Sequence, residues 1–444
     1  MPRAADPSLA RSAAIAVIRE LRAHGHIALL AGGCVRDELL GFDPTDYDVA
    51  TDATPDRVSA IFGSAHEVGA SFGVMLVRMP AAVIEVATFR SDGPYSDSRR
   101  PDTVHFSDPK NDAARRDFTV NALFLDPVRT PDEVSRDAAF AGAQINEAHH
   151  GTTPDSGGEP IGTVIDFVGG LADLAAKTIK AVGDPDARLR EDQLRALRAI
   201  RFAARYGFEL DEATADAIRA HANELKGVSR ERIGDEVRRM FAHPSRAVAA
   251  WTLQYLGLDL PVLGRHVTRS PGTLGRLVHD AAYPTCLAAW LLDRGEVVEA
   301  TQIAGVVRNA RDALNLSNDE RGALRDTLAG VGLLGRSWGG MPIARQKRAA
   351  ASAWFGPALQ IRAAESPEEM VRIRRRVEEL RQTPSGIAPE PLISGNDLIQ
   401  SGFQPGPGFQ RVLEAVYDAQ LEDRIATREE ALELARRSFE ELGR

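Results

Sequence analysis

Short apolar runs alternate with helical patterns along the first 127 residues of the chain. A short apolar run bounded by turn residues is typical of a buried strand, whereas apolar residues three or four positions apart indicate a helix with one buried face. The alternation therefore predicts a mixed β-sheet with flanking helices. The clearest expected strands lie at residues 28–30, 48–50, 74–77 and 83–87.

The pattern changes at two points further along. A polar stretch at about 128–163 has no usable periodicity, and we expect a long surface insertion there that is disordered. From about Leu171 the strand signals nearly vanish, and helical patterns rich in Ala, Leu, Arg and Glu continue to Arg444. The predicted fold class is α+β: a head with a mixed sheet and flanking helices at 1–170, which includes the insertion, then all-helical segments at 171–243 and 244–444.

Length and composition are those of an ordinary globular protein. The 444 residues are enough for about two to four domains, and 43% hydrophobic with 26% charged residues is an average balance. No run approaches the roughly 18 apolar residues of a membrane helix, and 2–21 lacks the apolar centre of a secretory signal. We therefore expect a cytoplasmic protein without a membrane partner. Cys34 and Cys286 are too few for a disulfide framework and are expected to be buried.

The formal net charge of −9 argues against general binding to polyanions. Affinity for nucleic acid comes mainly from cations that neutralise phosphates. A nucleic-acid partner would therefore need a local basic surface that the overall acidity hides.

The first candidate for chemistry is a glycine pair, Gly32 and Gly33, at the end of the first expected strand. A helix is expected from about Cys34 to Leu40. Glycines at a strand-to-helix junction leave backbone NH groups free, and the positive end of the helix dipole favours a phosphate there. Arg36 would add a fixed positive charge. Most glycine pairs only make turns, so this signal depends on its neighbours.

Two carboxylates follow, at Asp46 and Asp48. In a strand, side chains two positions apart point to the same face, so both carboxylates would face one point while Tyr47 faces away. Mg²⁺ prefers oxygen ligands and commonly bridges carboxylates to substrate phosphates. Two such ions can activate an attacking hydroxyl and stabilise a departing pyrophosphate. The alternative is a solvated loop edge, but the preceding strand, turn and helix favour a metal-dependent nucleotidyl-transfer site with Asp46 and Asp48 as metal ligands.

Three further motifs follow in a recognisable order, at 115–123 (RRDFTVNAL), 166–174 (DFVGGLADL) and 191–198 (EDQLRALR). With the opening motif, they resemble the class II tRNA nucleotidyltransferase and bacterial poly(A) polymerase family over about residues 25–240. The tail at 391–434 also looks like the family's C-terminal segment. The resemblance implies a catalytic head, a neck at 171–243 that binds the nucleotide base and RNA primer, and a body and tail at 244–444 that bind tRNA.

The resemblance also implies roles for single residues. Asp46 and Asp48 would bind the catalytic Mg²⁺ ions, and Gly33 with Arg36 would hold the triphosphate. Glu85 would supply a third carboxylate from a neighbouring strand, although a structural glutamate at a strand edge is nearly as good an interpretation. Residues 92–101 match the family's flexible loop, with Ser98 where relatives often have glycine.

In the second motif, Asp117 resembles the residue that contacts the sugar of the incoming nucleotide. A carboxylate accepts a hydrogen bond from a ribose 2′-OH, which deoxyribose lacks, so this position offers a reason for ribonucleotide preference. Arg116 beside it would contact phosphate or base. A structural surface salt bridge is the alternative for this pair.

Base selection is expected at Asp192 and Arg195, which are three apart in a helical pattern and so lie on nearly the same face. Cytosine and adenine present an amino donor beside a ring-nitrogen acceptor, whereas uracil and guanine present a carbonyl and a ring NH. An Asp/Arg pair complements the first two and clashes with the others. Arg198 and Arg201 follow at further steps of three, form a basic stripe with Arg188, Arg190 and Arg205, and would stack, hold phosphate or brace Asp192. The alternative is an exposed helix ion pair. Ser229 is a credible N-cap of the next helix. The resemblance implies that this helix helps to orient the site.

The leading functional hypothesis is template-independent addition of the 3′-terminal CCA to tRNA from CTP and ATP, with release of pyrophosphate. The alternatives are a poly(A) polymerase of the same family, or partial CC-only or A-only addition. Segment 68–74 is uncharged where poly(A) polymerases tend to be basic, which favours tRNA. A catalytically silent RNA-binding protein is the third hypothesis, and the intact Asp46 and Asp48 argue against it. The sequence leaves the oligomeric state open.

Overall fold

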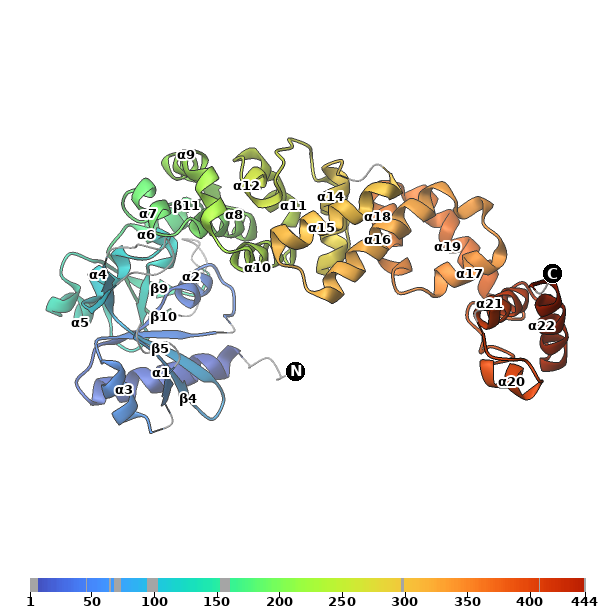
Figure 1. The fold of residues 1–444 in the computed structure, drawn as a ribbon. Helices are drawn as coiled ribbons and strands as arrows, with labels where there is room; N and C mark the ends of the chain where they lie inside the picture. The colour runs from blue at the N-terminus through green and yellow to red at the C-terminus, as the bar shows by residue number, and fades with distance from the viewer. Residues whose placement is uncertain are drawn as a thin grey trace. The chain divides into compact units, whose positions relative to one another are not determined.

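The computed structural model describes residues 7–44, 46–63, 65–67, 73–93, 103–151, 160–296, 299–406 and 408–442 (Figure 1). The chain forms two compact units. The first comprises residues 1–240 with 252–266, and the second comprises 241–251 with 267–444. Most of the flexible-loop motif and of the uncharged segment 68–74 lies outside the described residues.

An eight-stranded sheet forms the centre of the first unit, in the order β3-β4-β5-β2-β1-β8-β10-β9. Its β2 and β5 run parallel, and the other neighbouring strands run antiparallel, so the predicted mixed sheet is confirmed. All four strands expected from the apolar runs are present. The strands are β1 (Ala28–Ala31), β2 (Asp48–Thr51), β3 (Ala65–Glu67), β4 (Val74–Arg78), β5 (Val83–Thr88), β8 (Phe124–Asp126), β9 (Gln144–His149) and β10 (Pro160–Asp166).

Helix α1 (Pro7–Ala23) packs on β1, β2 and β5 (Figure 1). Its buried apolar face includes Val17, Ile18 and Leu21. Other helices of the head are α2 (Gly33–Leu39), α3 (Pro55–Ile61) and α4 (Pro109–Ala114). The core contains Leu29, Phe89 and Phe124, all fully buried. The rings of Phe89 and Phe124 meet edge to face at 5.8 Å between centroids. This core fixes the strand ends from which the candidate site residues project.

The expectation of a disordered insertion at 128–163 is wrong for the residues that the structure describes there. They form α5 (Pro131–Ser135), a 3₁₀ turn (Ala138–Phe140), β9 and the start of β10. Val134 and Phe140 are buried in the head core. Because β9 lies at the edge of the sheet and most of its residues are at least partly exposed, its sequence lacks the apolar run that identifies an inner strand.

The rest of the first unit is nearly all helical, as predicted. Its longest helix, α8, presents a buried apolar face that includes Leu197, Ile200 and Phe202. After β10, the described residues contain one pair of two-residue strands, β11 (Thr178–Ile179) and β12 (Glu209–Leu210), and an isolated bridge from Ala181 to Phe118. The helices are α6 (Gly170–Ala175), α7 (Pro185–Glu191), α8 (Leu194–Tyr206), α9 (Glu212–His221), α10 (Arg230–Phe241) and α12 (Asp259–Leu263).

The second unit is built from helices, again as expected. They are α13 (Gly272–Arg276), α14 (Tyr283–Asp293), α15 (Ile303–Leu314), α16 (Asn318–Arg336), α17 (Ile343–Ala351), α18 (Phe355–Glu365), α19 (Pro367–Arg381), α20 (Gly395–Gln400), α21 (Gly408–Leu421) and α22 (Arg428–Leu442), with α11 (Arg246–Tyr255) shared between the units. Within the described ranges, none of the helices has the length and hydropathy needed to span a bilayer. Cys34 and Cys286 are both buried and unbridged, as predicted.

Candidate active site

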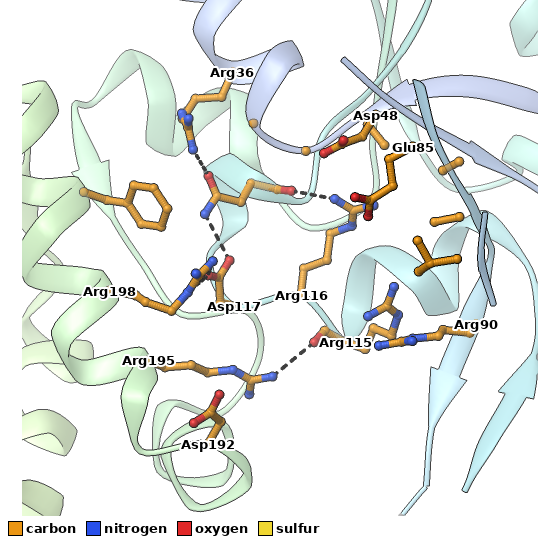
Figure 2. A pocket seen from close by; sticks show the side chains of 18 of the residues that line it. Arg36, Asp48, Glu85, Arg90, Arg115, Arg116, Asp117, Asp192, Arg195 and Arg198 are labelled. Carbon is orange, nitrogen blue, oxygen red and sulfur yellow. Dashed lines mark hydrogen bonds and ion pairs between the residues drawn. The ribbon is translucent and has the colours of Figure 1, made fainter. Parts of the chain in front are cut away.

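A cavity of about 810 Å³ opens in the first unit beside the β2–β5 pair, the turn before α2 and one face of α8 (Figure 2). Eleven of the twelve predicted site residues line it, and only Asp46 is absent from the lining. Residues more than a hundred positions apart in the sequence therefore meet in one place. The predicted members of the lining are Gly32, Gly33, Arg36, Asp48, Glu85, Arg116, Asp117, Asp192, Arg195, Arg198 and Arg201.

The turn between β1 and α2 requires glycine at its first position. Gly32 has φ +75° and ψ −126°, a conformation that side chains strongly disfavour. A Cβ atom there would lie 2.8 Å from Nη1 of Arg116. That guanidinium is held in place, because Nη1 donates to the carbonyl oxygen of Asn121 at 3.1 Å and Nη2 donates to Asp112 at 3.0 Å. The absence of a side chain at Gly32 therefore leaves room for the Arg116 guanidinium at the edge of the cavity.

We predict that Gly32→Ala destabilises the first unit by about 2 kcal/mol, the typical cost of a strained backbone conformation. The melting temperature should fall by about 4 to 8 °C. Gly227→Ala is the matched control, because Gly227 has no atom within 4 Å of the added Cβ and no positive φ. Thermal melts of the two variants would contradict the prediction if they shifted equally.

Two carboxylates lie side by side on the floor of the cavity. Asp48 and Glu85 are direct partners in the parallel register of β2 and β5, so their side chains share one face (Figure 2). Partial desolvation and the negative charge of Glu85 raise the pKa of Asp48 to about 6, against the opposing charge of Arg116. Asp46 lies exposed just before β2 and adds to this rise. The expected second-strand carboxylate is therefore next to Asp48.

The donor chemistry here suits a hard divalent cation. Carboxylate oxygens are the ligands that Mg²⁺ and similar ions prefer. Desolvation and the neighbouring negative charges raise the pKa of Asp48, and a bound cation would favour its charged form. Among the described residues, however, no group of three or more His, Cys, Asp or Glu side chains converges closely enough to form a complete protein cage. The residues fit an ion that takes further ligands from water and substrate, with Asp48 and Glu85 as the closest pair.

Arg36 is buried at the side of the cavity with only 4% of its surface exposed. Its guanidinium donates to Asp37 at 2.7 Å and to the side chain of Asn121. It also lies over the rings of Phe202 and Tyr206, at 5.1 and 4.6 Å from their centroids. These contacts hold the guanidinium between α2 and α8, in a more enclosed position than a surface phosphate ligand would have.

Asn121 is a site residue that the sequence analysis missed. Its side-chain oxygen accepts from Arg36, and its amide donates to Oδ1 of Asp117 at 3.0 Å. Its carbonyl oxygen also accepts from Arg116. Asn121 thereby connects three of the predicted residues. Its place inside the motif at 115–123 was the one available signal.

Asp117 is saturated with hydrogen bonds. Oδ2 accepts from Nε and Nη2 of Arg198 at 2.9 and 2.6 Å, and Oδ1 accepts from Asn121 and from the backbone NH of Phe118. Burial opposes ionisation, but the positive charge of Arg198 prevails and lowers the pKa of Asp117 to about 2. A carboxylate offers about four acceptor sites, so all of those on Asp117 are in use.

The expectation that Asp192 and Arg195 share a helix is wrong. Helix α7 ends at Glu191 and α8 begins at Leu194, and Asp192 between them is extended, with φ −152°. Asp192 accepts from the backbone NH of Leu194 at 3.0 Å and from Arg232 at 2.6 Å, which leaves it acceptor sites to spare. Arg195 pairs with Glu191 at 2.5 Å. Both side chains still line the cavity (Figure 2).

Helix α10 holds α8 and the segment just before it through two ion pairs that the sequence did not predict. Arg232 holds Asp192, and the buried Glu236 accepts from Arg201 at 2.6 Å. Arg201 also lies over the ring of Phe202, 4.2 Å from its centroid. Arg198 therefore pairs mainly with Asp117, although its Nη1 also lies 4.0 Å from Glu236, whereas Arg201 pairs with Glu236. This arrangement agrees with the expectation that the segment after Ser229 helps to orient the site.

The cavity lining is markedly basic. It contains eight arginines and five carboxylates, in a chain whose net charge is −9. Such a local positive surface favours a polyanionic ligand such as a triphosphate. Arg90 and Arg115, which were not predicted as site residues, also line the cavity, and both form ion pairs with Asp92.

Comparison with known proteins places this site in a family. A model described as "Poly A polymerase head domain" matches residues 28–144, and one described as "Probable RNA and SrmB- binding site of polymerase A" matches 207–258. A CCA-adding enzyme of Geobacillus thermodenitrificans is 36% identical over 72% of this chain and 70% of its own length. Another, from Geobacillus kaustophilus, is 31% identical over 94% of this chain and 95% of its own length. The chain belongs to the CCA-adding enzyme family.

Solved structures agree with the CCA-adding enzyme family. The crystal structure of the Bacillus stearothermophilus CCA-adding enzyme in complex with CTP aligns with a TM-score of 0.73 and 26% identity, covering 97% of this chain and 98% of that one. The resemblance given by the four motifs is confirmed, as is the order of a nucleotidyltransferase head followed by helices. Members of this nucleotidyltransferase family generally depend on a metal ion.

Proposed function

We propose that this protein adds C and A nucleotides to the 3′ end of tRNA to build the terminal CCA, without a nucleic-acid template. The observation that carries the proposal is one cavity that combines the Asp48–Glu85 pair with an arginine lining and with Asp192 and Arg195. Full-length similarity to CCA-adding enzymes supports the same reaction. Since tRNA is the substrate in this proposal, we expect the protein in the cytoplasm.

In this proposal the metal is Mg²⁺, and Asp46, Asp48 and Glu85 would hold it. Bound there, it supplies Lewis-acid stabilisation for attack on the α-phosphate and for departure of pyrophosphate. Arg116 contacts the triphosphate beside the glycine turn formed by Gly32 and Gly33. Arg36 acts from its enclosed place by fixing α2 against α8. The remaining catalysis comes from holding the primer 3′-OH and the nucleotide in line.

Base choice comes from Asp192 and Arg195 at the opposite side of the cavity. Asp192 accepts from the amino group of cytosine or adenine, and Arg195 donates to the neighbouring ring nitrogen. Uracil and guanine meet an acceptor with their carbonyl and a donor with their ring NH, so they are rejected. Asp117 contacts the ribose 2′-OH, and because its acceptor sites are full it does so by exchanging one of its present hydrogen bonds.

The larger segments take the roles that the family implies. The head at 1–170 performs the chemistry, the neck at 171–243 holds the base and the primer end, and the body and tail at 244–444 bind tRNA. The basic cavity supplies the local positive surface that a nucleic-acid partner of an acidic protein needs.

The experiment is transfer to a tRNA that ends immediately before CCA, with Mg²⁺ and each nucleotide separately or CTP with ATP. Sequencing of the RNA 3′ ends should show C after CTP alone and complete CCA after both. Failure to incorporate C would contradict the proposal. Long tails from ATP alone would show a poly(A) polymerase, and products that stop after CC or need a CC primer would show a partial enzyme.

A further inference from the structure

Tyr47 lies between the two predicted metal carboxylates and points away from them, into the protein. Its side chain is only 5% exposed. The hydroxyl donates a hydrogen bond of 2.7 Å to Oε1 of Glu38 on α2. The alternation of side chains predicts Tyr47 on the opposite face from Asp46 and Asp48, but no sequence pattern indicates a role for Tyr47 or Glu38. The structure shows what the tyrosine is attached to.

Glu38 is itself fixed from a third element. It is 2% exposed, and Nε of Arg11 on α1 donates to its Oε1 at 2.7 Å. Nη2 of Arg11 donates to the carbonyl oxygen of Ile161 on β10 at 2.8 Å. A buried carboxylate needs a charge partner and hydrogen bonds, and Arg11 and Tyr47 supply both. The hydroxyl of Tyr47 is therefore bound to a group whose position α1, α2 and β10 determine together.

The hydrogen bond from Tyr47 to Glu38 fixes a part of the chain that strand pairing does not hold. The ladder of β2 begins at Asp48, which pairs with Glu85, while Val49 is the first residue paired with β1. Asp46 and Tyr47 precede the strand. Since side chains alternate along an extended backbone, fixing the Tyr47 ring on one side sets the direction of the carboxylates on the other.

We infer that Tyr47, Glu38 and Arg11 form a positioning chain that sets the geometry of Asp46 and Asp48 for the divalent metal. The inference rests on the proposed metal-dependent function and deepens it. None of the three residues lines the cavity, so they act through the carboxylates they orient. Partners that orient metal-binding carboxylates typically change metal affinity or activity by roughly 10- to 100-fold when they are removed.

The test is Tyr47→Phe, which removes the hydroxyl and keeps the ring. We expect Mn²⁺ binding, measured by loss of the free-ion electron paramagnetic resonance signal, to weaken about tenfold. The Mg²⁺ concentration for half-maximal CTP incorporation should rise by a similar factor, with the KM for CTP at saturating Mg²⁺ unchanged. Glu38→Gln, which keeps an acceptor oxygen for Tyr47, should give a smaller change in the same direction.

Tyr417→Phe is the matched control. The hydroxyl of Tyr417 in the second unit donates to the carbonyl oxygen of Pro389 at 3.0 Å, so its loss removes a comparable bond far from the carboxylates in the chain. This control should alter the melting temperature without altering Mn²⁺ binding. A Tyr47→Phe protein that melts lower yet binds Mn²⁺ as tightly as the original would overturn the inference, because the bond would then be purely structural.

The two proposals fail in different ways. If the unmodified protein binds Mn²⁺ but transfers no nucleotide, the proposed function fails, and the binding comparison still tests the positioning chain. If the protein makes CCA ends and Tyr47→Phe leaves both Mn²⁺ affinity and the Mg²⁺ requirement unchanged, the positioning chain alone is refuted. Weaker Mn²⁺ binding in Tyr47→Phe and unchanged binding in Tyr417→Phe support it.

Discussion

Replacing Asp48 with asparagine is expected to lower nucleotide addition by roughly a thousandfold, because several kcal/mol of metal-derived stabilisation depend on a charged ligand at this position. Asp48 is the carboxylate that the structure places directly beside Glu85 and next to the basic lining of the cavity. An amide keeps the shape of the side chain but removes its charge. The measurement is CTP incorporation under single-turnover conditions with saturating Mg²⁺ and tRNA.

The same substitution should stabilise the metal-free protein. The folded pKa of Asp48 is about 6, above its ordinary value of 3.8, so between these values the folded state binds more protons than the unfolded state. Stability therefore falls as the pH rises through that window, and the full cost is present above pH 6. Because the residue is exposed, solvent screening reduces the cost to about 1 kcal/mol. Asp48→Asn should raise the melting temperature by about 2 to 4 °C at pH 7.5 in EDTA.

Asp43→Asn is the control for both readouts, since the Asp43 side chain is 81% exposed and lies near the same turn. It should leave transfer and melting temperature unchanged. Added Mg²⁺ should stabilise the unmodified protein and this control, and have little effect on Asp48→Asn. Efficient transfer by Asp48→Asn would remove Asp48 from the proposed catalytic residues.

The residues that sequence reasoning placed correctly are those whose position in the fold follows from local pattern. The apolar runs located β1, β2, β4 and β5, and the glycine pair located the turn before α2. The neighbouring-strand carboxylate Glu85 was assigned from the family resemblance, and the apolar pattern of β5 placed it on a strand. The pairing register of β2 with β5 places Glu85 opposite Asp48, and this register cannot be read from the sequence of either strand alone.

The predictions that were wrong or missing concern features that tertiary contacts determine. The segment around Asp192 looks continuously helical, yet Leu189 and Leu194 are five positions apart, which breaks the helical period of the buried face. Asp192, which lies at this break, is held by an ion pair with Arg232, forty residues later in the chain. Asn121 was invisible for a similar reason, because its contact with Arg36 joins residues 85 positions apart. Strand β9 lacks a clear pattern because it lies at the edge of the sheet.

The second large effect is expected at Asp192. Asp192→Ala removes the acceptor proposed for the amino group of cytosine and adenine, and a hydrogen bond to a charged group is worth about 1.5 to 3 kcal/mol. We expect kcat/KM for CTP and ATP to fall by roughly 10- to 100-fold. UTP and GTP should keep their low rates or gain, because the clash between their carbonyl oxygen and the carboxylate is gone. Discrimination should therefore collapse by at least the same factor.

Asp192 also has a structural bond to Arg232, so loss of position must be separated from loss of recognition. Arg232→Met removes the brace and keeps the carboxylate, and it should lower CTP and ATP use less while preserving rejection of UTP. Asp186→Asn is the control, since Asp186 is an acidic residue of the preceding helix whose side-chain partner is His221. If Asp192→Ala lowers all four nucleotides equally, Asp192 only supports the fold of the neck. If it lowers CTP and ATP selectively, the carboxylate itself reads the base, and the protein rather than a nucleic acid is the template.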